Sequence, residues 1–488
     1  MTWDGSPREL QTTPCARLLA GSSERSVSSS TWKIWDEGRA NVVRAKSRRA
    51  VCVIGIWHLG AVNAVGFAEK GYTVLGLESD KQKAASLQKG RPPLFEPGLE
   101  SMMTRHLKKG SLRFDSDPKA VATSDYVVIA YDSPVNEQDE VDVTPVLKAA
   151  EAIAPYLRSD TPVVITSQLP LGTSEKIEAR IRSLSPTWKS GVVYSPENLR
   201  LGTAIPRFLD PDMLVLGANQ PQALKSALAL YRPFQTVKLP MDLRSAEMVK
   251  HALNTFLATS ITFINEIAGL ADRLGADAVV VGQALKLDKR IGSKALMMPG
   301  LGFSGGTLAR DVIQLRKFAV ERGYKADLLD SILHVNEGTF ETILVKLKGA
   351  LGKLAGKRIG ILGLTYKAGT STVRQSPAIK LIDMLHKAKA ICIGYDPKAD
   401  SKEMRHYQHL FERAKKIQNL VKDADGLVLV TEWPEFKDLP FQSLAKLMKT
   451  AVMIDSKNYL DPDLLASAGF DYQGFGRRRR SKRPEDGK

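Results

Sequence analysis

Cysteine is scarce in this sequence of 488 residues, which contains only Cys15, Cys52 and Cys392. The three lie far apart, so neither a disulfide framework nor a site with closely spaced metal ligands is indicated, and we expect no bound metal. Cys52 and Cys392 each lie in an apolar run with strand character, where a small buried side chain is the ordinary interpretation.

Long apolar runs are also missing. No stretch of about 18 or more apolar residues occurs, so no membrane-spanning helix is predicted. The first 49 residues lack the continuous apolar segment that a secretory signal needs, and their acidic residues disfavour an organellar transit peptide. We therefore expect a soluble, cytoplasmic protein without a membrane partner.

The net charge is +17, but much of it lies near the ends of the sequence. Residues 1–50 contain nine Lys and Arg against five Asp and Glu, and residues 477–488 contain seven against two. We interpret 1–49 as a disordered extension and 477–488 as a solvated basic tail. Contact of residues 477–480 with nucleic acid or an anionic membrane is the alternative, and no specific nucleic-acid partner is expected.

Three ordered regions are predicted between these ends. From Val51 onward, short apolar runs alternate with helical patterns, which predicts a parallel sheet covered by helices over residues 50–235. Residues 236–345 should be helical, because apolar residues in 241–275 are spaced three and four apart without Gly or Pro before Gly269. A second β-α-β unit begins at Lys357 within residues 346–476. The predicted fold class is α/β, with two Rossmann-like parallel-sheet domains joined by a central helical region.

A dinucleotide-binding pattern follows the first predicted strand. Gly55 and Gly60 are its first and last glycines, and Glu78 ends the next strand, where an acid would bind ribose hydroxyls. Trp57 replaces the middle glycine, so its side chain must point away from the pyrophosphate or obstruct it. The motif alone is also consistent with an alternative, in which the turn and helix keep the Rossmann fold but no longer hold a dinucleotide in the usual pose.

Many ordered segments between about residues 50 and 477 resemble the UDP-glucose/GDP-mannose/UDP-N-acetylmannosamine dehydrogenases. The matching segments are Pro93-Leu-Phe-Glu-Pro-Gly-Leu99, Ser133-Pro134, residues 195–200, 202–204, 246–258, 290–292, 302–303, 311, 363–367, 374–377, 395–397, 431–433 and 436. Enzymes of this family oxidise the C6 alcohol of a nucleotide-linked sugar twice, pass two hydrides to two NAD molecules and trap the aldehyde on a cysteine. The resemblance implies NAD as cofactor and a UDP-glucose-like or UDP-N-acetylmannosamine-like substrate, in polysaccharide precursor biosynthesis.

The resemblance also implies catalytic roles. Lys250 and Asn254 would stabilise the developing oxyanion, and their i, i+4 spacing places both on one helical face. Asp311 would orient a water molecule, and Glu197 would act as acid and base. Each has a plainer alternative: Lys250 as a solvated helix residue, Asp311 as a helix cap and Glu197 as a surface carboxylate.

Further residues are implied to bind cofactor or substrate. The cofactor set comprises Gly55, Trp57, Gly60, Glu78, Ser133, Gln168 and Arg374, and the substrate set comprises Arg290, Gly302, Phe303 and Lys367. Lys367 and Arg374 would meet the nucleotide diphosphate or the second edge of the cofactor, since their charge and donors suit phosphate. Arg290 would reach the sugar, from its own chain or from a partner subunit. Solvent exposure is the alternative for each of these cations.

The catalytic loop departs from the family pattern. Residues 302–311 read Gly-Phe-Ser-Gly-Gly-Thr-Leu-Ala-Arg-Asp, where the family has Gly-Phe-Gly-Gly-Ser-Cys-Phe-Pro-Lys-Asp, so Thr307 stands in place of the cysteine. A thiol needs little help to become a nucleophile, whereas an alkyl hydroxyl needs a dedicated base. Gln168 stands for a family threonine, and Arg310 stands for a family lysine.

Two functions remain open on this basis. The favoured one is NAD-dependent oxidation that stops at the aldehyde, or oxidises the aldehyde hydrate slowly, because the thiol is missing. The alternative is a catalytically impaired nucleotide-sugar-binding homologue with a regulatory role, since Trp57 and Thr307 alter the cofactor and the chemistry positions. In both cases the apolar face of the long central helix predicts a homodimer, as in the family.

Overall fold

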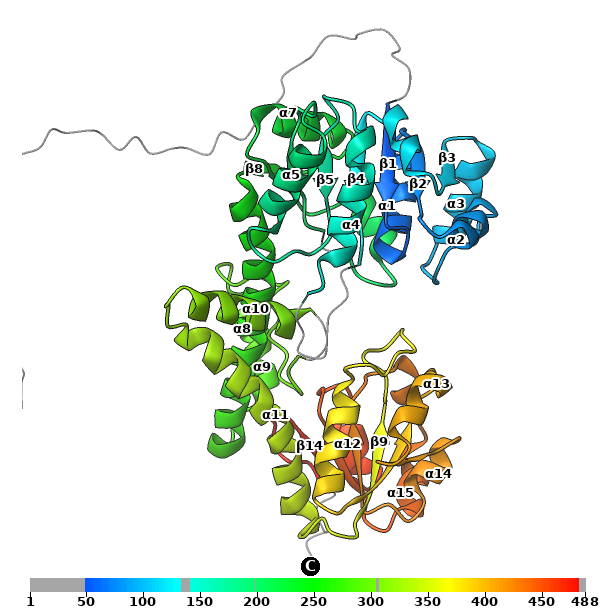
Figure 1. Ribbon diagram of the computed structural model, residues 1–488. Helices are drawn as coiled ribbons and strands as arrows, with labels where there is room; N and C mark the ends of the chain where they lie inside the picture. The colour runs from blue at the N-terminus through cyan, green and yellow to red at the C-terminus, as the bar shows by residue number, and fades with distance from the viewer. Residues whose placement is uncertain (1–48, 133–140, 198, 304–306, 482–488) are drawn as a thin grey trace, which may run out of the picture. The chain divides into compact units, whose positions relative to one another are not determined.

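The computed structural model describes residues 49–132, 141–197, 199–303 and 307–481 (Figure 1). Its first sheet has eight strands in the order β3-β2-β1-β4-β5-β6-β7-β8. These are β1 (Ala50–Ile54), β2 (Thr73–Leu77), β3 (Leu112–Asp115), β4 (Tyr126–Ile129), β5 (Val163–Ile165), β6 (Val192–Tyr194), β7 (Leu214–Gly217) and β8 (Lys238–Met241). The order 3-2-1-4-5-6 of the first six strands is that of a Rossmann fold.

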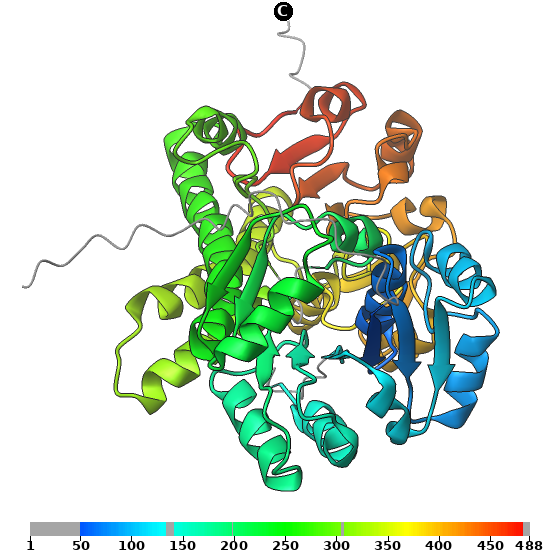
Figure 2. The same cartoon turned by 90° about the horizontal axis from the view of Figure 1, so that it is seen from above.

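Helices cover both faces of this sheet (Figure 2). They are α1 (His58–Glu69), α2 (Lys81–Gln88), α3 (Leu99–Lys108), α4 (Thr144–Ile153), α5 (Thr173–Leu184), α6 (Ala204–Leu209) and α7 (Pro221–Leu230), with short 3-10 turns at Pro118–Thr123 and Ala154–Tyr156. Successive strand residues point to opposite faces, so Val51 and Val53 join a core with α1 and α3, while Cys52 and Ile54 join one with α4 and α5. Burial on both faces explains why the strands read as continuous apolar runs rather than alternating ones.

The strand β7 is the exception to the predicted parallel arrangement. It pairs with β6 in the antiparallel direction, through Tyr194 and Gly217, whereas β8 runs parallel to β7. In the described part of the chain between β6 and β7 there is one helix, α6, of six residues. The remaining neighbours in the sheet are parallel, as predicted.

The central region is built on the helix α8 (Leu243–Leu274), which packs against α9 (Ala278–Leu287), α10 (Leu308–Glu321) and α11 (Asp327–Leu351). The carboxylate of Asp242 accepts a hydrogen bond from the Ser245 N–H at the start of α8, and Gly275 ends it with a φ of 72°. Both boundaries lie within the predicted helical stretch. Although α8 has 32 residues, no helix in the described ranges is apolar enough along its length to cross a bilayer.

The second sheet has six parallel strands in the order β11-β10-β9-β12-β13-β14, again that of a Rossmann fold. They are β9 (Arg358–Leu362), β10 (Ile391–Tyr395), β11 (Glu412–Arg413), β12 (Gly426–Leu429), β13 (Val452–Asp455) and β14 (Asp471–Gly474). The helices are α12 (Pro377–Lys387), α13 (Ser401–Met404), α14 (Ile417–Val421), α15 (Phe441–Leu447) and α16 (Pro462–Ser467), with 3-10 turns at Arg405–Tyr407 and Pro434–Phe436. The predicted fold class, with two Rossmann-like sheets and helices between them in sequence, is therefore confirmed.

The arginine run at residues 477–480 is tied to the folded body, not wholly solvated as its composition suggests. Backbone hydrogen bonds pair Arg480 with Tyr472 of β14. The side-chain partners are Asp277 for Arg477, the Gly275 carbonyl oxygen for Arg478, Asp471 for Arg479 and Asp463 for Arg480. The partners of Arg477 and Arg478 lie about 200 residues away in the sequence, so local composition does not reveal them.

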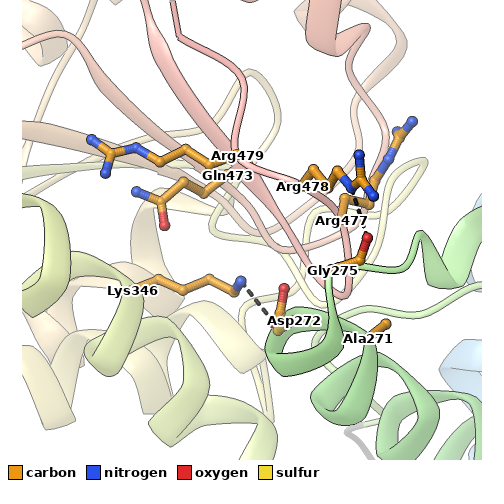
Figure 3. A pocket seen from close by; sticks show the side chains of 8 residues that line it. All are labelled: Ala271, Asp272, Gly275, Lys346, Gln473, Arg477, Arg478 and Arg479. Atoms are coloured by element: carbon orange, nitrogen blue, oxygen red, sulfur yellow. Dashed lines mark hydrogen bonds and ion pairs between the residues drawn. The ribbon is translucent and has the colours of Figure 1, made fainter.

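Three of these arginines line a pocket of about 210 Å³ together with Lys346 and the end of α8 (Figure 3). Lys346 Nζ lies 2.8 Å from an Asp272 carboxylate oxygen, and Arg478 Nε donates to the Gly275 carbonyl oxygen at 2.7 Å. The carboxyl end of a helix carries partial negative charge, so these cations stabilise the end of α8. The pocket lies between the end of α8 and β14, and Lys346 and Arg478 each have a partner at this end of α8.

Candidate active site

The carboxylate of Asp311, in the first turn of α10, is the centre of a buried hydrogen-bond network. It accepts hydrogen bonds from the side-chain amides of Gln168 and Asn254, and His251 Nδ1 lies 3.0 Å from its Oδ1. Arg310 in turn donates to the amide oxygen of Gln168. The structure thus brings Asn254, Asp311 and Gln168 together from three segments that are far apart in the sequence.

Lys250 is also buried, one turn of α8 before Asn254. Its Nζ donates to the backbone carbonyl oxygen of Glu197 at 2.8 Å. Burial lowers the pKa of Lys250 to about 8, although the negative charge of Asp311 acts in the opposite direction. The alternative of a solvated helix residue is therefore wrong for Lys250.

Glu197 is largely buried and has the opposite perturbation. Desolvation raises the pKa of its carboxyl to about 8, and the negative charge of Asp132 adds to this effect, while a hydrogen bond from Asn63 and the charge of Lys250 oppose it. Among the described residues no hydrogen-bond partner reaches its Oε2. A buried carboxyl with a pKa near neutrality is suited to proton transfer, so the alternative of a surface carboxylate is also wrong.

The dinucleotide turn is held by close packing at its two glycines. Gly55 has a φ of 88°, and a Cβ there would lie 2.8 Å from the Tyr131 ring; a Cβ at Gly60 would lie 2.0 Å from the Gly55 carbonyl oxygen. Only glycine is compatible with this turn. Trp57 precedes α1 with 49% of its surface exposed, so its side chain reaches solvent.

A carboxylate of the chain itself lies at the start of α1. Asp132, just after β4, accepts a hydrogen bond from the Leu59 N–H at 3.1 Å through Oδ2. The N–H groups at a helix N-terminus are the usual donors to a dinucleotide diphosphate. Asp132 was not identified from the sequence, where an acid after an apolar strand gives no indication that it reaches a helix about 70 residues earlier.

Glu96, within the Pro93–Leu99 match, joins the dinucleotide turn to a second loop. Its Oε2 lies 3.0 Å from His58 Nε2 and accepts a hydrogen bond from the Gly202 N–H at 2.8 Å, while its Oε1 accepts one from the Ala204 N–H at 2.8 Å. The matched segments Pro93–Leu99 and 202–204, whose sequences suggest no chemistry, therefore meet at the buried carboxylate of Glu96. These hydrogen bonds hold residues 202–204 beside the dinucleotide turn.

The catalytic loop is supported by Asn336 of α11. The Phe303 N–H donates to Asn336 Oδ1 and the Phe303 carbonyl oxygen accepts from Asn336 Nδ2, both at 2.9 Å. Gly302 has a φ of 67°, and a Cβ there would lie 2.3 Å from Asn336 Oδ1. The Phe303 ring packs in the core with Val312, so Gly302 and Phe303 themselves are firmly held. Thr307 is exposed at the N-terminus of α10, while 304–306 lie outside the described residues.

The other predicted ligand residues lie at several places in the fold. Glu78 follows β2 and accepts a hydrogen bond from the Asp80 N–H. Lys367 is half-buried, and desolvation lowers its pKa. Arg374 is exposed, and Arg290 is exposed and paired with Asp288 at 2.6 Å. Ser133 lies outside the described residues.

No thiol in the described part of the chain is suited to replace the missing cysteine. Cys52 and Cys392 lie inside the cores of the two sheets. Burial raises the pKa of each thiol to about 12, which keeps both protonated near neutral pH.

Two Rossmann sheets, a glycine turn at the first of them and a buried cluster of ionisable groups on the intervening helices define the class of NAD-binding dehydrogenases. Three domain models of the UDP-glucose/GDP-mannose dehydrogenase family match this chain: the NAD binding domain over residues 49–235, the central domain over 244–338 and the UDP binding domain over 360–462. The chain belongs to this family. The resemblance seen in the sequence is confirmed, and with it NAD as the cofactor.

Relatives extend over almost the whole described chain. UDP-glucose 6-dehydrogenase of Rhizobium meliloti (strain 1021) is 37% identical over 435 residues, which are 88% of this chain and 99% of the relative. Among solved structures, UDP-glucose dehydrogenase from Pyrobaculum islandicum is 31% identical with a TM-score of 0.80, covering 90% of this chain and 100% of that one. UDP-D-ManNAc dehydrogenase from Pyrococcus horikoshii is 25% identical with a TM-score of 0.76, covering 88% and 99%.

Proposed function

We propose that this protein oxidises the C6 alcohol of a nucleotide-activated sugar with NAD, and that the sugar nucleotide resembles UDP-glucose or UDP-N-acetylmannosamine. The names of the relatives support these substrates, and we include in the proposal a role in making polysaccharide precursors. The observation that carries the proposal is the burial of Lys250 and Glu197 in contact with each other, each with a pKa of about 8.

In the proposed reaction the ionised form of Glu197, which predominates above its pKa of about 8, accepts the proton of the alcohol as the C6 hydride leaves, which yields an aldehyde. NAD, when bound, supplies the hydride acceptor. The ammonium of Lys250 and an amide N–H of Asn254 stabilise the negative charge that develops on the oxygen. Asp311 orients the Asn254 amide by accepting a hydrogen bond from it. In addition, Asp311 would orient a water molecule.

Thr307 determines how far the reaction proceeds. A second oxidation through a covalent intermediate requires a nucleophile, and a threonine hydroxyl without a dedicated base does not supply one. The thiols of Cys52 and Cys392 are buried in the sheets. We therefore expect the reaction to stop at the aldehyde, with slow oxidation of its hydrate.

Cofactor and substrate binding follow from the remaining predicted residues. Gly55, Gly60 and Glu78 would hold the dinucleotide, with the Trp57 side chain directed to solvent. Lys367 and Arg374 would bind phosphate of the nucleotide, and their unequal exposure makes Lys367 the stronger candidate because its charge is partly desolvated.

A homodimer is proposed through α8. Phe256, Phe263 and Leu270 are spaced seven residues apart on this helix, with exposed fractions of 70%, 48% and 51%. Their spacing puts them on one face, and apolar side chains repeated along one exposed helical face are typical of a helix that packs against a partner. A second copy of the chain is the occupant that we propose, and it would also bring Arg290 to the site of its partner.

The activity is tested by NADH formation with UDP-glucose, UDP-N-acetylmannosamine and GDP-mannose, with Lys250→Met as the control lacking the oxyanion-stabilising charge. We expect one NADH per sugar in the fast phase and a loss of about 100-fold or more in kcat for the control. No NADH with any of the three sugars would refute the proposal. A rapid yield of two NADH per sugar would refute the stop at the aldehyde.

The alternative function is a regulatory homologue that binds nucleotide sugars without turnover. Asp132 at the start of α1 favours it, because a negative charge there opposes a dinucleotide diphosphate. Calorimetric titration separates the two functions. Sugar-nucleotide binding without NAD binding would support the regulatory homologue, whereas tight NAD binding would exclude it.

A further inference from the structure

His251 lies on α8 directly after Lys250 and is completely buried. Its Nδ1 is 3.0 Å from Asp311 Oδ1, and its Nε2 is 3.0 Å from the Leu169 carbonyl oxygen. The sequence gives it no distinction, because a histidine on the buried face of a helix is ordinarily a core residue. Its two contacts give it a defined chemical state.

Both contacts of the His251 ring are to acceptors. A carbonyl oxygen can only accept a hydrogen bond, and so can an ionised carboxylate, so both ring nitrogens must carry a proton for both contacts to be favourable. The ring is then an imidazolium cation. A buried carboxylate also requires a paired charge or several donors to offset its lost hydration, and His251 supplies that charge to Asp311.

The His251–Asp311 pair belongs to a series of hydrogen bonds that leads to Asn254, one of the two residues proposed to stabilise the oxyanion. Asp311 Oδ1 also accepts from Gln168, and its Oδ2 accepts from Asn254. His251 and Asn254 are three residues apart on α8, so one carboxylate spans both and sets the plane of the Asn254 amide. With one N–H of that amide held by Asp311, the second N–H has a defined direction.

Other ionisable groups lie near the His251–Asp311 pair. Lys250 and Glu247 lie on α8, Arg310 lies on α10, and Tyr194 lies on β6. The Glu247 carboxylate accepts hydrogen bonds from the backbone N–H groups of Gly172 and Ser174. The Phe318 ring of α10 meets the His251 ring edge-on, with centroids 6.4 Å apart.

We propose that His251 is a positioning residue of the hydride-transfer site: its imidazolium holds Asp311 ionised and oriented, and Asp311 in turn holds the Asn254 amide beside Lys250. This role rests on the proposed function. It extends the site by a residue that does not touch the substrate.

The first test measures the ring without any substrate. In protein labelled with ¹⁵N-histidine, the His251 signals are identified by their loss in His251→Gln. Because both ring contacts are to acceptors, we expect them to show two protonated ring nitrogens under the conditions of the activity assay. A ring with one unprotonated nitrogen under these conditions would overturn the proposal, whatever the activity of the protein.

The second test separates positioning from packing. His251→Gln keeps a donor but loses the charge, and we expect kcat to fall by roughly 10- to 100-fold, with the KM of the sugar nucleotide and the NAD affinity unchanged. Phe318→Leu alters the packing around the same ring, so it should lower the unfolding temperature and leave kcat nearly unchanged. Equal kcat values for wild type and His251→Gln would overturn the positioning role. An inactive wild type would refute the proposed function and this role together, while an imidazolium signal would still establish the ion pair.

Discussion

Glu197→Gln should change how stability depends on pH, because the folded protein holds this carboxyl in its neutral form. Its pKa is about 8 in the fold against an ordinary value of 4.5. Between these two values the unfolded chain has released a proton that the folded chain retains, so stability falls as pH rises. Each pH unit in this window lowers the free energy of unfolding by about 1.4 kcal/mol. Between pH 6 and pH 8 the decrease amounts to about 2 kcal/mol, because the carboxyl is already partly ionised near pH 8.

The assay is urea unfolding of wild type and Glu197→Gln, followed by fluorescence at pH 6 and pH 8. Glutamine has nearly the same shape and an acceptor for Asn63, but it does not titrate. The free energy of unfolding of the variant, relative to that of wild type, should therefore be about 2 kcal/mol higher at pH 8 than at pH 6. Lys250 titrates in the opposite sense: its pKa is about 8 in the fold against 10.5, so its contribution to stability rises between those values, above this window. A difference between the proteins that is the same at both pH values would refute the assignment of a neutral, buried Glu197.

Three further predictions concern cofactor, chemistry and assembly. Asp132→Asn should tighten NAD binding about fivefold in calorimetry, because one partly screened repulsion near the diphosphate is worth ~1 kcal/mol; equal affinities would show that Asp132 moves aside freely. Thr307→Cys should raise the fast NADH yield from one toward two per sugar, and a yield that stays at one would show that more than the thiol is missing. Phe256→Glu should convert a dimer to a monomer in light scattering, whereas a variant that remains dimeric would place the interface elsewhere.

The sequence predicts the architecture well where a local pattern carries the information. Apolar runs followed by glycine turns identify β1 and β9, and the spacing of apolar residues identifies α8 almost to its ends. The strands β3 and β8 were not predicted, because their sequences, Leu-Arg-Phe-Asp and Lys-Leu-Pro-Met, include charged residues or proline and form no continuous apolar run.

The site was predictable only as far as its residues belong to recognisable motifs. The resemblance to the family singles out Lys250 and Asn254, and the structure places both on the buried side of α8, with the Asn254 amide against Asp311. His251 and Asp132 were missed because their partners lie about 60 and 70 residues away in the sequence, and no local pattern encodes such contacts. Gln168 was expected near the cofactor, and the structure places its amide against Asp311.

The arginines at 477–480 matter for anyone who shortens or extends this chain. A stop codon placed before Arg477 would remove the partners of Asp277, at the start of α9, and of the terminal carbonyl of α8, along with the backbone pairing to β14. Removing this charged segment would therefore remove contacts that connect β14 to the ends of α8 and α9. An affinity tag is better added beyond this run than substituted for it.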